Sequence, residues 1–316
     1  MNNYSLAFVG MGSIGKRHFR NVCKVLEEQG YNYSIDLFRS DVTRQLPEDI
    51  MDKVNMQYIY SGEISEETMY DAVFITNPTS LHLETIKKFK EHTKAFFIEK
   101  PIFDTIDIDD SFLKELDDTI SYVACPLRYC PALKYLKEQI NYEDAISIRA
   151  ISSSYLPDWR PGQDYRQCYS AHRDMGGGVG IDLIHEWDYL TAFWGMPKEV
   201  FVIQDQISQL EIDSDDIAIY IARVGNKTIE LHLDYFGRKT VRTLELYMPN
   251  DTIRIDIEDG VINYLKDDKI IHLGTERNDY QVEEIQHFFS IVQRKIANDS
   301  TPRHAYNVLK LTKGLI

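Results

Sequence analysis

The chain has 316 residues, 43% of them hydrophobic and 27% charged, which is typical of a globular protein large enough for two domains. A formal net charge of −15 and a pI of about 5.0 exclude nucleic acid as a general partner, because an acidic surface repels phosphate backbones. We see no apolar run long enough for a bilayer span and no basic segment leading into a long apolar one, so we expect no membrane span and no secretory signal.

Cysteine usage points to a reducing compartment. Cys23, Cys125, Cys130 and Cys168 lack the close pairing of zinc ligands and are too few for a disulfide framework. We therefore expect reduced thiols in a cytoplasmic protein.

Short apolar runs alternate with helical patterns over residues 1–124. The expected strands are 5–9, 33–38, 71–76, 95–98 and 121–124, and the expected helices are 14–30 and 80–92. This alternation predicts an α/β fold with a doubly wound parallel sheet, that is, a Rossmann dinucleotide-binding domain.

Residues 125–316 have a different pattern. Helices are expected at 131–140, 181–193, 279–295 and from about 302, and strands at 145–155, 199–207, 216–224, 228–235, 241–248 and 252–257. The alternation within these strands predicts an α+β domain with a large, mostly antiparallel sheet of six or more strands. The C-terminal helix is expected to pack back on the first domain.

Gly10, Gly12 and Gly15 form a Gly-x-Gly-x-x-Gly turn that follows the first strand and opens the first helix, with Ser13 and Ile14 between the last two glycines. That context is the one in which the motif binds a dinucleotide. The first glycine allows the tight turn, the second lets the pyrophosphate approach the backbone, and the third lets helix and strand pack closely. The helix N-terminus then offers N–H groups to the phosphates.

The end of the second strand bears on the choice of cofactor. Arg39 and Ser40 stand there, and an arginine with a hydroxyl suits a 2′-phosphate, so we expect NADP(H). The alternative is that Arg39 is a solvated surface charge and Asp41 binds the ribose of NAD(H).

Glu99-Lys100-Pro101 lies at the carboxyl end of an apolar strand, the edge where an open α/β sheet binds ligands. A lysine there can pair with the cofactor or exchange a proton with a developing alkoxide.

Several short motifs occur together in one order. They are Gly10 to Gly15, Asn77-Pro78 with His82, Glu99-Lys100-Pro101, Arg128-Tyr129-x-Pro131, Trp159-Arg160, and Gly176-Gly177-Gly178 followed by His185 and Asp188. In this combination the chain resembles the glucose–fructose oxidoreductase / inositol 2-dehydrogenase / MocA (Gfo/Idh/MocA) family over nearly its whole length. The resemblance implies a nicotinamide-dependent oxidoreductase acting on a sugar, cyclitol or nucleotide sugar. It also implies a homodimer or homotetramer formed through the open sheet.

The resemblance assigns roles to individual residues. Lys100 is expected beside the nicotinamide, and His185 is the expected general acid/base. Asp182 is the third expected catalytic residue, although it lies three residues before His185 where the family has an aspartate four before; both spacings share one helix face. Glu186 and Asp188 are the alternatives for orienting the histidine or binding substrate. Thr76, Asn77, Pro78, His82, Glu99 and Arg128 join the glycine turn, Arg39, Ser40 and Lys100 as expected cofactor contacts.

A polar and aromatic loop, 156–175, supplies expected substrate contacts. They are Trp159, Arg160, Tyr165, Arg166 and His172, to which Asp188 is added. Packing of the loop for structural reasons is the competing interpretation. No tight metal-ligand set is seen, and hydride transfer needs none, so we expect no metal.

Two other functions use the same residues. One is a cofactor-binding sugar sensor without turnover, which loss of Lys100 or His185 would have favoured. The other is a hydrolase or lyase that oxidises and re-reduces its sugar within one cycle.

Overall fold

The computed structural model describes residues 3–274 and 276–316, which form two compact units. The first unit comprises Met1–Ala124 and Gln281–Tyr306, and the second comprises Cys125–Tyr280 and Asn307–Ile316. Within the described ranges, no helix is both long enough and apolar enough to cross a membrane.

The first unit is built on a six-stranded parallel sheet with the order β3-β2-β1-β4-β5-β6. Its strands are β1 (Asn3–Val9), β2 (Asn32–Arg39), β3 (Met56–Ile59), β4 (Ala72–Ile75), β5 (Ala95–Ile98) and β6 (Ile120–Val123). The two central strands β4 and β5 are buried along their whole length, as continuous apolar runs in a parallel sheet require.

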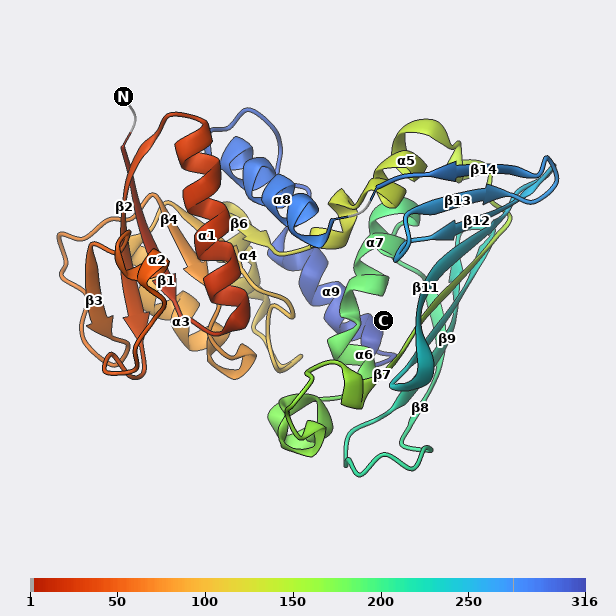
Figure 1. Ribbon diagram of the computed structural model, residues 1–316, viewed down its shortest axis with the longest axis horizontal. Helices are drawn as coiled ribbons and strands as arrows, with labels where there is room; N and C mark the ends of the chain where they lie inside the picture. The colour runs from red at the N-terminus through yellow and green to blue at the C-terminus, as the bar shows by residue number, and fades with distance from the viewer. Residues whose placement is uncertain (1–2, 275) are drawn as a thin grey trace. The chain divides into compact units, whose positions relative to one another are not determined.

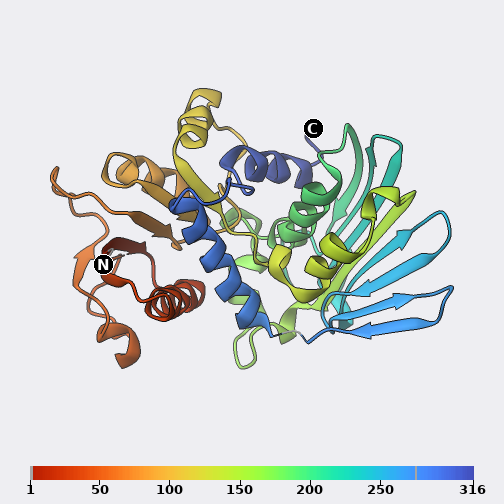
Figure 2. The ribbon, with the colours of Figure 1, turned by 90° about the horizontal axis from the view of Figure 1, so that it is seen from above.

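Several helices belong to the same unit as this sheet. They are α1 (Ser13–Glu28), α2 (Glu48–Met51), α3 (His82–Phe89), α4 (Asp110–Asp118) and the part of α8 (Arg277–Val292) that begins at Gln281. Figures 1 and 2 show α8 beside α1, and Arg17 donates to Gln281 across the two helices. Phe288 of α8 packs edge-on against Phe74 and Phe97 of the sheet, so a distant segment of the chain completes this core.

The second unit contains an eight-stranded sheet with the order β14-β13-β12-β11-β7-β10-β9-β8. Its strands are β7 (Ser147–Tyr155), β8 (Glu199–Asp205), β9 (Ile217–Val224), β10 (Lys227–Asp234), β11 (Phe236–Tyr247), β12 (Thr252–Asp256), β13 (Val261–Tyr264) and β14 (Lys269–His272). Among the described strand pairs of this sheet, only β7–β10 is parallel. The predicted fold class, a Rossmann unit plus a mostly antiparallel sheet, is confirmed.

Helices α5 (Pro131–Gln139), α6 (Val179–Asp182) and α7 (Ile184–Trp194) lie along one face of this sheet (Figure 1). The last helix, α9 (Pro302–Thr312), contains residues of both units. The single helix expected over 181–193 is interrupted at Leu183, which has a non-helical backbone (φ −96°, ψ 24°). Asp182 and His185 therefore lie on two short helices instead of one.

Candidate functional site

The glycine turn after β1 is packed so tightly that two of its positions admit only glycine. Gly10 has φ +89°, and a β-carbon there would lie 2.6 Å from the backbone of Asn77. A β-carbon at Gly15 would lie 2.6 Å from Thr76 Oγ1, which itself donates to the carbonyl of Gly10 at 2.8 Å. The turn is thus locked onto the end of β4.

Gly12 differs from its two neighbours in the motif. It caps the N-terminus of α1, and a β-carbon there would meet no atom of the described residues within 4 Å. Ser13 and Ile14 follow as the first two residues of the helix, with Ser13 exposed. Open space over a helix N-terminus that carries no side-chain cap is the cradle that a pyrophosphate fills, so these residues fit a dinucleotide.

Arg39 ends β2, as expected, but its guanidinium is buried and already bound. Nη1 donates to Gln57 Oε1 (2.8 Å) and Nη2 to the carbonyl of Arg44 (2.5 Å). Ser40 is exposed next to it, and the Asp41 carboxylate accepts hydrogen bonds from Thr43. A 2′-phosphate at this strand end would have to share Arg39 with those partners.

The end of β4 forms a second wall of the glycine turn. Thr76 is buried against Gly10, Asn77 Nδ2 donates to Thr85 (2.8 Å), and Pro78 begins the next turn. His82 is buried with ring nitrogens 3.1 Å from the carbonyls of Asn77 and Pro101, and burial lowers its pKa. His82 thus ties the end of β4 to the segment after Lys100.

Glu99 organises the end of β5. Its Oε1 lies 2.5 Å from His18 Nε2 of α1, and its Oε2 accepts the backbone N–H of Lys100 (3.0 Å). Burial by itself raises the pKa of Glu99, but the bond to His18 and the neighbouring positive charges lower it overall. The glutamate is therefore an anchor that fixes the backbone of Lys100 at the carboxyl edge of the sheet.

In the second unit, the run Gly176-Gly177-Gly178 packs against the chain itself. A β-carbon at Gly177 would lie 2.1 Å from the carbonyl of Tyr169, and one at Gly178, where φ is +131°, would lie 2.5 Å from Asp215. The glycines thus let the loop 156–175 and the segment before β9 approach the start of α6.

Asp182 is buried and accepts a hydrogen bond of 2.6 Å from the hydroxyl of Tyr235. Trp159 packs edge-on against the ring of Tyr235 and donates to Ser154 (2.9 Å). Burial and the charge of Asp182 raise the pKa of Tyr235, which stays a neutral donor. Asp182 and Trp159 therefore meet through Tyr235, a residue not predicted from the sequence.

His185, in the first turn of α7, lies in a cluster of buried charges. Arg242 Nη2 of β11 donates to His185 Nε2 (3.0 Å), and Arg242 Nε donates to Glu186 Oε1 (2.8 Å). Glu186 is 0% exposed, and although burial alone raises its pKa, Arg242 and His185 lower it to about 2. Neither Glu186 as a partner of Arg242 nor Arg242 itself was predicted.

Arg128 and Asp188 form a two-pronged ion pair, with Nε to Oδ2 at 2.7 Å and Nη2 to Oδ1 at 2.6 Å. The sequence suggested the first as a cofactor contact and the second as a substrate contact. The structure joins them, so each neutralises the other.

The arginines of the loop 156–175 are also engaged. Arg166 is bound by Asp164 through two nitrogens (both 2.9 Å) and by Glu211 through a third (2.8 Å). Tyr165 accepts the backbone N–H of Glu211 (3.2 Å), and Arg160 lies 5.4 Å from the ring centre of Tyr169. Arg160 and Arg166 are both exposed, but of the two only Arg166 has a carboxylate partner among the described residues, so Arg160 is the better placed to meet a ligand.

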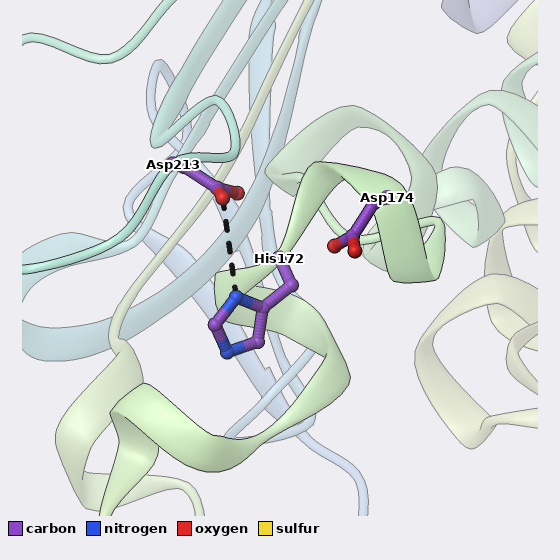
Figure 3. Close-up of side chains that lie close together, drawn as sticks. All are labelled: His172, Asp174 and Asp213. Atoms are coloured by element: carbon purple, nitrogen blue, oxygen red, sulfur yellow. Dashed lines mark ion pairs between the residues drawn. The ribbon is translucent and has the colours of Figure 1, made fainter.

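His172 lies beside two carboxylates in the same loop (Figure 3). His172 Nε2 is 2.7 Å from the carbonyl of Arg166, Nδ1 is 4.0 Å from Asp213 Oδ2, and Asp174 is the third member within ligand distance. Both aspartates are exposed, and groups of exposed carboxylates such as this are common without a metal ion.

Comparison with known proteins agrees with this architecture. A family model described as "Oxidoreductase family, NAD-binding Rossmann fold" matches residues 4–118. The chain is 25% identical over 200 residues to a myo-inositol 2-dehydrogenase of Thermotoga maritima, covering 62% of this chain and 57% of that protein. It is 30% identical over 192 residues to the uncharacterized oxidoreductase YrbE of Bacillus subtilis, covering 59% and 52%. The aligned part thus spans little more than half the length of these relatives.

Solved structures match the whole chain. Levoglucosan dehydrogenase in complex with NADH has a TM-score of 0.82 at 16% identity, covering 99% of this chain and 96% of that one. UDP-N-acetylglucosamine 3-dehydrogenase from Acidithiobacillus ferrooxidans has a TM-score of 0.73 at 16% identity, covering 100% and 97%. At this identity the likeness is one of fold.

Proposed function

We propose that the chain is a member of the Gfo/Idh/MocA family of oxidoreductases and that it moves hydride between a nicotinamide dinucleotide and a secondary alcohol or ketone of a sugar, cyclitol or nucleotide sugar. The family model matched over residues 4–118 and the two dehydrogenase-like relatives support this proposal. The observation that carries the proposal is the glycine turn, with open space over Gly12, on the same strand edge as Lys100.

Different residues of the chain have different roles in this reaction. The N-terminus of α1 holds the pyrophosphate through backbone N–H groups, and the end of β4 holds the turn in shape. When bound, the nicotinamide supplies the hydride donor or acceptor. Glu99 fixes the backbone of Lys100, and Lys100 and His185 stabilise the reacting oxygen and handle its proton.

The test is nicotinamide absorbance against a panel of sugars, cyclitols and nucleotide sugars, with Lys100→Met and His185→Ala variants. We expect each variant to lose at least about a hundredfold in kcat, the usual contribution of an acid or base. Glu115→Gln, an exposed residue of α4 whose described partner is Lys90, is the control with unchanged kcat. Variants of Lys100 and His185 that turn over like wild type would remove both from catalysis. A tightly bound cofactor with product formed but no net absorbance change would instead indicate the transient-redox lyase or hydrolase.

For the cofactor we propose NADP(H), since Arg39 and Ser40 end β2. Arg39 then exchanges its bond to Gln57 for the 2′-phosphate. Binding titrations with NAD⁺ and NADP⁺ decide this, and a preference for NAD⁺ would exclude it.

We propose that the protein forms a homo-oligomer through its larger sheet. Phe201 and Ile203 on β8 are 74% and 67% exposed, and Ile221 of neighbouring β9 is also exposed. Such adjacent apolar side chains favour a protein interface. Light scattering of wild type and Phe201→Asp tests this, with a smaller species expected for the variant and an unchanged mass arguing against it.

A further inference from the structure

We propose that His18 is a positioning residue that fixes Lys100 at the carboxyl edge of the parallel sheet, by holding the Glu99 carboxylate that binds the Lys100 backbone. All three residues lie in the first unit. This role deepens the proposed function and rests on it for the part that Lys100 plays in turnover. The contacts between the three residues do not depend on it.

The two oxygens of the Glu99 carboxylate have different partners. Oε2 accepts the backbone N–H of Lys100 at 3.0 Å, a local bond between neighbours in the chain. Oε1 lies 2.5 Å from Nε2 of His18, which belongs to α1 and is 81 residues away in the sequence. A local bond at a strand end competes with water and with other rotamers of the side chain. The contact with His18 is therefore the one that selects the rotamer of Glu99.

The side chain of His18 makes one polar contact among the described residues, and that contact is with Glu99. The side chain is 1% exposed, and its other ring nitrogen, Nδ1, is buried with no hydrogen-bond partner in the described part of the chain. Because an ionised carboxylate has only acceptors, Nε2 must carry a hydrogen and donate it to Glu99. The imidazole ring packs edge-on against Phe97 of β5, with the ring centres 4.9 Å apart. His18 thus contacts β5 through its ring and Glu99 through its N–H.

The Glu99 carboxylate stays ionised in this position. Burial by itself raises its pKa, but the bond from His18 and the charge of Lys100 lower it overall. Hydrogen bonds to an ionised acceptor are roughly twice as strong as neutral ones. Two strong hydrogen bonds therefore connect α1, through Glu99, to the backbone of Lys100.

α1 is also the helix whose start is proposed to hold the pyrophosphate. Its N-cap is Gly12, and His18 follows six residues later, less than two helical turns away. The start of the helix is fixed by Gly15, where a β-carbon would lie 2.6 Å from Thr76. One rigid element therefore presents N–H groups to the cofactor and an imidazole to Glu99. A shift of about 1 Å between cofactor and catalytic group can cost about a hundredfold in rate, so this shared support matters for turnover.

Lys100 can be observed by itself in NMR, because the dipeptide Glu-Lys occurs once in the sequence, at residues 99–100. Cell-free synthesis of the full chain with carbonyl-¹³C glutamate and ¹⁵N lysine gives a single signal that carries both isotopes, the Lys100 amide. We expect this amide to exchange slowly with solvent hydrogen in the wild type. His18→Leu removes the donor and keeps an apolar side chain, so the exchange should become at least about tenfold faster. His18→Gln, whose amide nitrogen replaces Nε2, should restore the wild-type rate to within about threefold.

His92→Gln is the matched control. His92 is a half-buried histidine of the same unit that lies just before the amino end of β5, with Nδ1 3.2 Å from the carbonyl of Thr68. Its replacement should change neither the Lys100 amide nor turnover. Where turnover is found, His18→Leu should lower kcat at least about tenfold and change dinucleotide affinity less than about threefold, because the glycine turn is intact. His18→Gln should recover most of that kcat.

Three results would overturn the role of His18. The first is a wild-type His18 whose Nε2 carries no hydrogen in ¹⁵N NMR, a measurement that needs no variant to fold. The second is a Lys100 amide that exchanges in His18→Leu as it does in the wild type. The third is a folded His18→Gln that exchanges as fast as His18→Leu, since the ring would then contribute packing alone. The expected exchange rates with no turnover on any alcohol would instead refute the proposed function and leave His18 as the anchor of the Lys100 backbone.

Discussion

Replacing Gly10 by alanine should destabilise the fold for two steric reasons, the positive φ of the backbone and the close approach of Asn77. A residue with a side chain at φ +89° costs about 1–2 kcal/mol. Its β-carbon, 2.6 Å from the Asn77 backbone, adds about 1–3 kcal/mol of overpacking, since backbone atoms cannot rotate away. We expect Gly10→Ala to lower the free energy of unfolding by about 2–5 kcal/mol, a large fraction of the 5–15 kcal/mol typical of a domain.

Gly12→Ala is the matched contrast in the same turn. Its backbone has φ −68° and its new methyl group meets no described atom within 4 Å, so the free energy of unfolding should change by less than about 1 kcal/mol. The methyl group would project into the space that the proposed pyrophosphate needs. We expect dinucleotide binding at least about tenfold weaker, equivalent to 1.4 kcal/mol.

Urea unfolding followed by circular dichroism measures the first quantity, and calorimetric titration with NAD⁺ and NADP⁺ measures the second. The reasoning about the turn fails if Gly10→Ala is as stable as wild type. The assignment of the phosphate site fails if Gly12→Ala folds normally and binds both dinucleotides as tightly as wild type.

Three further changes test other contacts. Arg39→Ala should weaken NADP⁺ binding at least about tenfold and spare NAD⁺, and an equal loss for both dinucleotides in titrations would assign Arg39 a structural role only. The pKa of Glu186 is about 2 when folded against an ordinary value of 4.5, so its charge stabilises the protein above pH 4.5 and this contribution, about 3 kcal/mol, is lost as the pH falls toward 2. Urea unfolding from pH 5 to pH 3 should therefore show a shallower loss of stability in Glu186→Gln, and an equally steep loss would contradict the sign. Asp188→Asn removes the carboxylate charge from the mostly buried pair with Arg128 and should lower the free energy of unfolding by about 3–5 kcal/mol in thermal or urea unfolding, whereas a change below about 1 kcal/mol would show the pair to be solvent-screened.

The strands that sequence patterns located well are those whose signal is local and strong. β5 lies at Ala95–Ile98 as predicted, because an apolar run bounded by turn residues admits one interpretation. β3, at Met56–Ile59, was missed because most of its residues are exposed and no alternation marks it. β14, at Lys269–His272, was missed for the same reason. Both are edge strands, which are held to the sheet by backbone hydrogen bonds. The pattern of hydrophobic and polar side chains does not indicate such pairing.

The candidate site shows the same contrast between local and long-range features. The glycine turn was predictable because its function depends on spacing within six residues. The partners of the charged groups were not, since Glu99 meets His18 across 81 residues and Glu186 meets Arg242 across 56. Nothing in one sequence indicates which of many opposite charges meet after folding, so Arg242 was not singled out.

The first unit is completed by residues that the ribosome makes late. Ser300 bonds the backbone of Val123 through both its carbonyl and its hydroxyl, and Asn298 donates to the carbonyl of Ser121, so this segment covers the free edge of β6. Once Ala124 has been added, about 150 further residues must be made before the segment from Gln281 appears, which takes roughly 10–30 s at usual elongation rates. During that interval the nascent sheet presents an unpaired edge and an uncovered aromatic surface, the features that favour chaperone binding and edge-to-edge misassociation. Slow translation of residues 125–280 should therefore lower the yield of correctly folded first unit.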